Sequence, residues 1–398
     1  MTPAHLQRYA DVMVWALQKA RANAFKTGDI VLIRYHKAAL PLAEVLYRRC
    51  LEMGFLVEQR LIATPAMEKD FFKLGSQEQL AFIAPGERRL YRKLNGSIYL
   101  YAPDAITHLS DIASSRIARR AIALKPLRDI LDKREAQGDF GWTLALFPTA
   151  ELATHADLST LEYEAQVAKA CYLNRRDPLA RWEEIYQQVS HIKVWLNSLD
   201  IKYLQVQSAG TDLQVGIGDQ RRWIGLSGHN IPSFEIFTSP DWRQTEGTYF
   251  SDQPSYRQGN YVRGVQLTFE RGRVKQARAE EGETFLIEQI AMDKGACRIG
   301  EFSLTDKRFS KINRFMANTL YDENYGGKNG NCHLALGSAY ADAFSADVAT
   351  LTKAMKTKLG FNDSALHWDL VNTEKKQVVA HLRTGKKVVI YENGSFQH

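Results

Sequence analysis

The carboxylates and imidazoles between residues 230 and 370 are the side chains of this sequence best suited to chemistry. His367 and Asp369 stand two residues apart in the segment LHWDL. If this segment is a strand, both side chains point to one face, because side chains alternate along a strand. An imidazole beside a carboxylate can hold a divalent metal ion. Two polar residues on the wet face of a surface strand would give the same pattern, so the pair alone leaves both interpretations open.

Three glutamates of the same region are further candidates. Glu235 and Glu301 lie between apolar and aromatic residues in IPSFEIFT and CRIGEFSL. A buried carboxylate is costly unless a cation or hydrogen bonds stabilise it. Glu323, in LYDENYG, precedes His333. Four carboxylates and two histidines suit two adjacent metal ions with one shared carboxylate, although spacing cannot show that the six residues converge.

The segment YDENYGGKNGNCHLALGSAY places a glycine- and asparagine-rich stretch, residues 325–331, between Glu323 and His333. Such a stretch is either a surface bulge or a flap beside the site. Tyr340 follows His333 by seven residues. In a continuous helix the two would lie about 10 Å apart along the axis. The chain must therefore bend, or Tyr340 serves a neighbouring position, such as a hydrogen bond to a developing oxyanion.

Two domains are expected to position these residues, with a boundary between residues 199 and 200. Residues 200–398 read as short alternating segments separated by turn residues, which predicts a β-rich α+β domain that carries the metal ligands. Residues 1–199 predict an α/β domain with parallel strands, because strand, helix and strand follow one another. Its expected strands are 28–36, 56–62, 96–104 and 142–149, and its expected helices are 1–24, 38–55, 114–137, 158–173 and 178–199.

Composition narrows the class of protein. The 398 residues are 45% hydrophobic and 24% charged, which is typical of a soluble globular protein. No apolar run approaches the roughly 20 residues of a membrane span, and no signal peptide is evident. Four scattered cysteines without CxxC spacing favour a reduced, cytoplasmic protein. The net charge of +7 is dispersed among acids, so a nucleic-acid partner is not expected.

The ordered motifs resemble those of the thermophilic aminopeptidase family, the dinuclear metallopeptidases of the aminopeptidase T and aminopeptidase S type. The N-terminal stretch FKTGDIVLIRYHKAALPLAEVLYRRCLEMG and the helical region after FPTAELATHADL are similar to that family. The segments GTDLQV, HNIPSFEIFTSP, GEFSL, LYDEN, HLALGSAY and HWDLV then follow in the family's order. The resemblance therefore covers nearly the whole chain.

The resemblance implies an aminopeptidase that releases N-terminal amino acids from peptides through a metal-activated water at a two-metal site. It implies a homodimer and metal ligands at Glu235, Glu301, Glu323, His333, His367 and Asp369. Glu301 would bridge the metals or act as general base, and Tyr340 would be catalytic. Zinc is the expected metal, and the oxygen-rich ligand set would also accept cobalt, manganese or magnesium. The lengthened segment 325–331 and Phe234 depart from the family's usual pattern.

Two other functions remain open on the sequence. Some proteins of this expected fold resemble ring-opening dioxygenases, which use a single iron held by two histidines and an aspartate and could lose the glutamates. A non-catalytic metal-binding protein is the other alternative. Metal stoichiometry would distinguish the first, and the absence of turnover on peptides or aminoacyl amides would indicate the second.

Overall fold

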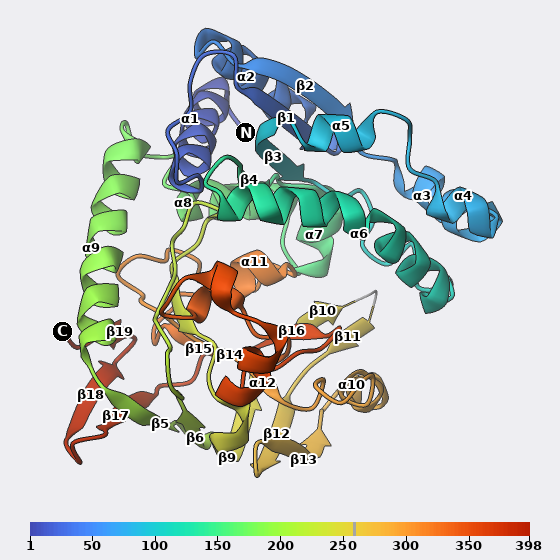
Figure 1. Cartoon of the computed structure of the whole chain (residues 1–398). Helices are drawn as coiled ribbons and strands as arrows, with labels where there is room; N and C mark the ends of the chain where they lie inside the picture. The colour runs from blue at the N-terminus through green and yellow to red at the C-terminus, as the bar shows by residue number, and fades with distance from the viewer. Residues whose placement is uncertain (258–259) are drawn as a thin grey trace. The chain divides into compact units, whose positions relative to one another are not determined.

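The computed structural model describes residues 1–257 and 260–398, which fold into two compact units (Figure 1). The first unit comprises Met1–Trp182 and Ser227–Pro232, and the second comprises Glu183–Leu226 and Ser233–His398. The packing thus divides the chain inside helix α9, Pro178–Ser198, whereas the boundary expected from the sequence follows residue 199. Trp182 accounts for part of the difference, because this residue of α9 packs against Trp15 in the first unit.

The first unit contains a parallel five-stranded sheet in the order β2-β1-β3-β4-β7. Its strands are β1 (Ile30–Tyr35), β2 (Leu56–Leu61), β3 (Leu94–Tyr101), β4 (Gly141–Leu146) and β7 (Asn230–Ile231). The predicted α/β class with parallel strands is confirmed. The short edge strand β7 was not predicted, because it comes from a segment far along the chain.

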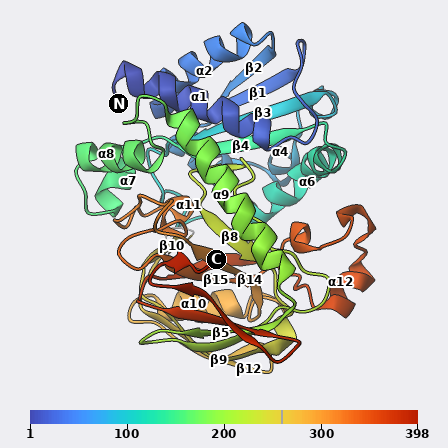
Figure 2. The same ribbon diagram turned by 90° about the vertical axis from the view of Figure 1, so that its left-hand side faces the viewer.

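Helices surround this sheet. They are α1 (Pro3–Lys19), α2 (Leu40–Glu52), α3 (Pro65–Leu74), α4 (Gln77–Ala81), α5 (Glu87–Tyr91), α6 (Ser114–Ala136), α7 (Ala150–His155) and α8 (Thr160–Ala170). Helix α1 begins where a hydroxyl can cap it: Thr2 accepts a hydrogen bond from the backbone N–H of His5 at 3.2 Å, and Pro3 follows. Its buried face carries Val12, Met13 and Leu17, and α1 lies beside α2 (Figure 2).

Part of the basic sequence between residues 114 and 137 has a structural role. On α6, Arg116 donates to the backbone carbonyls of Phe72 and Gly75, at the end of α3. Arg120 donates to the carbonyl of Phe82 at 2.6 Å, just after α4. The last carbonyls of a helix lack partners within the helix, and a cation there is favourable. These arginines therefore hold two short helices in place.

A buried ion pair in the first unit gives a prediction about stability. Arg21 Nη1 lies 2.5 Å from Asp29 Oδ2, and both side chains are at most 5% exposed. Asp29→Ala should lower the free energy of unfolding by about 3–5 kcal/mol, because it leaves the Arg21 charge buried and uncompensated. Denaturant unfolding measures this. The matched control is Asp129→Ala, which removes an exposed partner of Lys125 and should cost less than about 1 kcal/mol. Equal losses in the two variants would contradict the prediction.

The second unit contains an antiparallel eight-stranded sheet in the order β13-β12-β9-β6-β5-β17-β18-β19. Its strands are β5 (Ile201–Gln207), β6 (Asp212–Gly216), β9 (Thr245–Ser251), β12 (Val265–Glu270), β13 (Arg273–Arg278), β17 (Gln377–Leu382), β18 (Lys387–Glu392) and β19 (Ser395–Phe396). This sheet confirms the β-rich class expected for the second half of the chain.

A second antiparallel sheet of this unit has the order β16-β15-β14-β8. Its strands are β8 (Glu235–Thr238), β14 (Ile299–Thr305), β15 (Asn331–Gly337) and β16 (His367–Asn372). The unit also contains the hairpin β10 (Ser255–Arg257) and β11 (Asn260–Val262) and the helices α10 (Glu283–Ile290), α11 (Thr319–Asp322) and α12 (Lys353–Leu359). Within the described ranges, no helix combines the length and apolarity that a membrane crossing requires.

The two central strands of the four-stranded sheet are buried on both faces. Every residue of β14 and β15 is buried, although polar and apolar side chains alternate along them. The eight-stranded sheet is tied to this one by Tyr249 on β9, whose hydroxyl donates to the Leu370 carbonyl on β16 at 2.7 Å. One face of the sheet therefore collects buried polar side chains, which include Glu301 and His333.

Candidate metal centre

Strand register brings the candidate ligands onto one face of the four-stranded sheet. Glu301 on β14 and Asp369 on β16 both lie opposite Ala335 on the central strand β15. Directly opposite residues of antiparallel strands share a face. His333 precedes Ala335 by two positions and His367 precedes Asp369 by two, so both histidines lie on that same face. The predicted strand with His367 and Asp369 side by side is therefore confirmed.

Glu235 joins the same face from the edge of the sheet. It is the first residue of β8 and lies opposite Thr305. Thr305 follows Glu301 by four positions on β14, so the two share a face. Five of the six candidate ligands thus come from four neighbouring strands, although they are scattered from residue 235 to residue 369 of the sequence.

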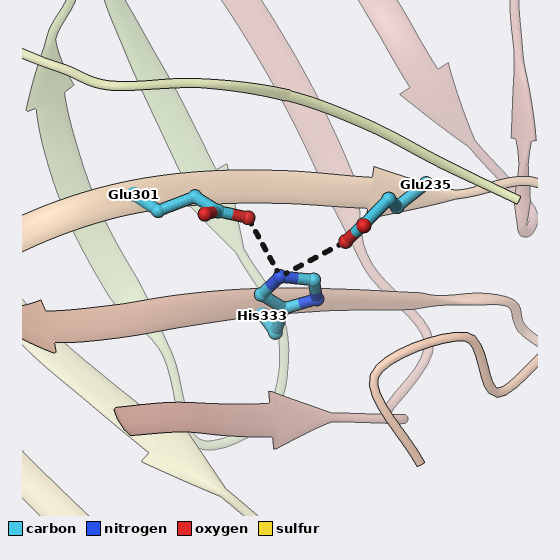
Figure 3. A group of neighbouring side chains, drawn as sticks. All are labelled: Glu235, Glu301 and His333. Carbon is cyan, nitrogen blue, oxygen red and sulfur yellow. Dashed lines mark hydrogen bonds and ion pairs between the residues drawn. The ribbon is translucent and has the colours of Figure 1, made fainter. Parts of the chain in front are cut away.

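The first cluster of side chains consists of Glu235, Glu301 and His333 (Figure 3). His333 Nε2 lies 3.0 Å from Glu301 Oε1 and 3.5 Å from Glu235 Oε2. One potential ligand atom from each residue lies within 4.8 Å of the others. All three residues are buried, so the cluster offers two carboxylates and one imidazole in a space with little access to water.

The second cluster consists of Glu301, His367 and Asp369. His367 Nε2 lies 3.3 Å from Asp369 Oδ1 and 3.7 Å from Glu301 Oε2. Glu301 therefore faces His333 with one carboxylate oxygen and His367 with the other. A carboxylate common to two ligand clusters has the arrangement that a bridging ligand between adjacent metal ions requires.

Glu323 lies next to these clusters, and among the described residues it belongs to neither of them. It directly follows α11, is buried, and lines a small cavity together with Asp369 and Tyr256. Burial and the negative charge of Glu235 raise the pKa of Glu323 well above its ordinary value. The ionisation of Glu323 thus depends on a carboxylate of the site, although Glu323 itself lies outside the sheet.

Tyr340 packs against His367, with 4.9 Å between the ring centroids. The segment that contains His333 is the strand β15, so a continuous helix from His333 to Tyr340 does not exist. The chain leaves the sheet after Gly337, and the tyrosine packs beside His367 and Phe237. Tyr340 remains 43% exposed, and burial of its hydroxyl raises its pKa further above 10. The phenol therefore keeps its proton at neutral pH.

The carboxylates and imidazoles strongly affect one another. Burial and the charge of Glu301 raise the pKa of Glu235 to about 8. Burial alone would lower the pKa of His333, but the hydrogen bond to Glu301 and the surrounding carboxylates raise it to about 9. Burial would also raise the pKa of Asp369, but the charge of His367 and its hydrogen bond lower it to about 2. Negative charge is thus concentrated at the site, and groups of the site hold protons when no metal ion balances that charge.

This donor set fits divalent metal ions. Three carboxylates, those of Glu235, Glu301 and Asp369, face the two imidazoles, and Glu323 is buried near them. A buried carboxylate is stable only when a cation or hydrogen bonds compensate its charge. His367 Nδ1 lies 2.9 Å from the Ser338 carbonyl oxygen, and this contact directs Nε2 toward Glu301 and Asp369, as an outer contact does for a histidine that binds metal. Nitrogen and oxygen donors of this kind suit zinc, cobalt or manganese.

Comparison with known protein families shows to which family the chain belongs. The family described as thermophilic metalloprotease (M29) matches residues 2–396. The chain belongs to this family. The resemblance expected from the ordered motifs is therefore confirmed.

Several curated relatives of this M29 protein carry the name aminopeptidase. This chain is 31% identical over 274 residues to aminopeptidase AmpS of Bacillus subtilis (strain 168), and the aligned region covers 64% of this chain and 63% of that protein. It is 30% identical over 267 residues to aminopeptidase T of Thermus aquaticus, covering 64% and 62% of the two chains. The aligned region thus spans less than two thirds of these relatives. The solved structure of wild-type AmpT from Thermus thermophilus shares the fold over 99% of both chains, with a TM-score of 0.83 and 22% identity.

The glycine-rich segment of this M29 protein packs into the second unit. The backbone N–H of Gly326 donates to the Ile312 carbonyl at 2.8 Å, and Asn329 Nδ2 donates to the Thr373 carbonyl at 3.3 Å. Gly330 is buried, and a Cβ there would overlap the hydroxyl of Tyr391. Residues 325–331 therefore form a hydrogen-bonded loop against β18 rather than an exposed bulge. Phe234, the other departure, is fully buried.

Sequence reasoning missed a guanidinium beside the site. Arg257 Nη1 donates to the backbone carbonyl of His367 at 2.8 Å, and its charge helps to lower the pKa of Asp369, an effect weaker than those of His367 and His333. Nothing in the local sequence of Arg257 indicates this contact, because it depends on the hairpin β10–β11 meeting β16. Arg257 is a fixed cation at the edge of the ligand face.

Gly337, the last residue of β15, gives a prediction about the site. Its φ is +104°, and a Cβ there would overlap the Leu366 carbonyl, next to His367. Gly337→Ala should reduce divalent-ion binding and thermal stability together, because β15 and β16 must separate to admit the methyl group. Calorimetric titration and thermal unfolding measure the two effects. Gly385→Ala is the matched control: its φ is +87° with nothing within 4 Å, so it should cost about 1–2 kcal/mol and leave ion binding unchanged. Normal ion binding by Gly337→Ala would contradict the prediction.

Proposed function

We propose that this protein is a metal-dependent aminopeptidase that releases N-terminal amino acids from peptides at a two-metal site. The observation that carries the proposal is Glu301, whose two carboxylate oxygens face the two histidines of separate ligand clusters. Membership of a metalloprotease family and relatives named aminopeptidases support the reaction class. The substrates are peptides with a free N-terminus.

Two divalent ions are proposed, with zinc expected and cobalt, manganese or magnesium as alternatives. Glu235 and His333 would hold one ion, His367 and Asp369 would hold the other, and Glu301 would be shared. Glu323 would complete the set from the end of α11. When bound, such ions polarise a carbonyl and lower the pKa of a water to supply the nucleophile.

The protein's own groups have separate proposed roles. Glu301 is 3% exposed, and its oxygens lie within reach of both imidazoles, so its two alternative roles are to be shared between the ions or to receive a proton from the attacking water. Tyr340 keeps its phenolic proton and is partly exposed beside His367, so it can donate a hydrogen bond to the developing oxyanion. A carboxylate of the site would bind the α-amine of the substrate and so set the register of cleavage.

A single-iron dioxygenase would require only the His/His/Asp set. Here Glu235 and Glu301 lie within 3.5 Å of His333, and a site of two histidines and one aspartate would not require these buried glutamates. The two-cluster arrangement favours hydrolysis over ring opening. The same reasoning favours an enzyme over a metal-binding protein without activity, since a shared carboxylate is not needed to hold one structural ion.

Two broader expectations complete the proposal. A homodimer is proposed from the resemblance of the ordered motifs, and light scattering on the purified protein tests it. A cytoplasmic location is proposed from the cysteines: all four are free, as expected in a reducing compartment.

The test of the proposed function is turnover by metal-stripped protein after one divalent ion at a time has been restored. The substrates are a panel of amino-acid amides and short peptides. We expect no turnover without metal, restored turnover with zinc or cobalt, and sequential release of single residues from the N-terminus.

N-acetylated versions of the same peptides are the matched controls, and they should resist cleavage because the α-amine is blocked. Cleavage of acetylated peptides at internal bonds would replace the aminopeptidase proposal with an endopeptidase. Saturation at one metal ion per chain with no peptide turnover would favour the alternatives.

A further inference from the structure

We propose that Asn324 is a positioning residue for the metal centre, because its carboxamide ties the chain around Glu323 to the start of the strand that carries Glu235. This inference rests on the proposed function, in which both glutamates are metal ligands. Asn324 directly follows Glu323, and Phe234 directly precedes Glu235. A contact between Asn324 and Phe234 therefore joins two ligand-bearing segments.

The carboxamide of Asn324 is fully buried and uses both of its ends. Its Oδ1 accepts a hydrogen bond from the backbone N–H of Phe234 at 2.5 Å. Its Nδ2 donates to the carbonyl of Leu320 in α11 at 3.0 Å. The orientation of the amide follows from its partners, because a backbone N–H requires an acceptor and a backbone carbonyl requires a donor.

A third contact connects the amide with a ligand itself. Nδ2 of Asn324 lies 3.5 Å from Glu323 Oε1. An amide donor at this position orients the carboxylate while leaving its charge unchanged. Outer contacts of this kind fix the direction of a metal ligand, and their loss typically lowers metal affinity by about 10–100-fold.

The position explains why Glu323 can serve the site although it lies outside the sheet. The other ligands are held by the ladder of β16, β15, β14 and β8, whereas Glu323 follows the four-residue helix α11. The short helix is joined to the beginning of β8 through Asn324. No side chain without both a donor and an acceptor could satisfy the Phe234 N–H and the Leu320 carbonyl together.

The experiment titrates metal-free Asn324→Ala with Zn²⁺ and with Mn²⁺ by calorimetry and measures thermal unfolding in parallel. We expect the variant to bind Zn²⁺, Mn²⁺ or both about 10–100-fold more weakly than the wild type does. Asn324→Ser, which keeps a small polar group too short to reach Phe234, is the second variant and replaces Asn324→Ala if that protein does not fold.

The matched control is Asn372→Ala. Asn372 is also fully buried, and its Nδ2 donates to the Phe250 carbonyl at 2.8 Å, away from the proposed ligands. It should lose thermal stability comparably but bind both metals like the wild type. Wild-type affinity in the Asn324 variants, or the same loss of affinity in Asn372→Ala, would overturn the positioning role. If the wild type itself bound no divalent ion, the proposed function would fail instead.

Discussion

Glu301→Gln should reduce kcat/KM by about 10³-fold or more, because a general base typically contributes 10²–10⁴-fold and this residue also faces both ligand clusters. The substitution removes a negative charge at nearly constant volume. Glu301 Oε1 lies 3.0 Å from His333 and Oε2 lies 3.7 Å from His367, so the loss acts on both imidazoles. Steady-state kinetics on the amide panel and metal analysis of the same protein measure the effect.

Glu374→Gln is the control for exchanging a carboxylate for an amide in the same unit. Glu374 accepts hydrogen bonds from Ser208 and from the backbone N–H of Gly210, and it faces none of the proposed ligands. We expect this variant to keep wild-type kcat/KM and metal content. Wild-type turnover by Glu301→Gln at saturating metal would show that Glu301 neither bridges nor acts as the base.

Removal of metal should abolish activity and lower thermal stability in the same protein. Without a cation, the buried carboxylates of Glu235 and Glu323 keep their charge only at a cost, and burial beside other carboxylates raises their pKa values so that they take up protons. A ligand present at 1,000 times its dissociation constant stabilises the folded state by about 4 kcal/mol, so chelation should lower the unfolding midpoint by several degrees. Thermal unfolding with and without a chelator, followed by restoration of one ion at a time, measures both effects.

The isosteric double variant Glu235→Gln, Glu301→Gln provides the control for this stabilisation. It removes two buried carboxylates that the metal-free protein must either protonate or leave uncompensated, so the metal-free variant should unfold at a higher temperature than the metal-free wild type, and chelation should affect it little. An unfolding midpoint of the wild type that is insensitive to chelation, with activity retained, would show that the cluster does not hold a functional metal.

The types of residue in the site follow from the sequence through local rules. Alternation along CRIGEFSL predicts a strand, because polar and apolar side chains point to opposite faces of a sheet. The spacing of His367 and Asp369 predicts that they share a face, and the register of β16 confirms this. Each prediction concerns neighbours in the sequence, whose relative positions are set by backbone geometry alone.

Long-range contacts decided the remaining features. The shared position of Glu301 depends on which strands pair and in which register, and a shift of one residue would move Asp369 to the other face. Strand β7 joins the first unit's sheet from a distant segment, and residues 325–331 pack against β18 instead of forming an exposed bulge. In the sequence Asn324 resembles an ordinary turn residue, and only the folded chain shows that its side chain contacts Phe234.

The sequence by itself therefore determined the family, the two fold classes and the chemical character of the ligands, because these depend on residue types, their order and local periodicity. The tertiary structure decided that Glu301 faces both histidines, that Tyr340 packs beside His367, and that Asn324 joins two ligand-bearing segments. The physical reason is that hydrogen-bonded strand pairing and side-chain packing act between residues that are far apart in the chain, and no local pattern specifies such partners.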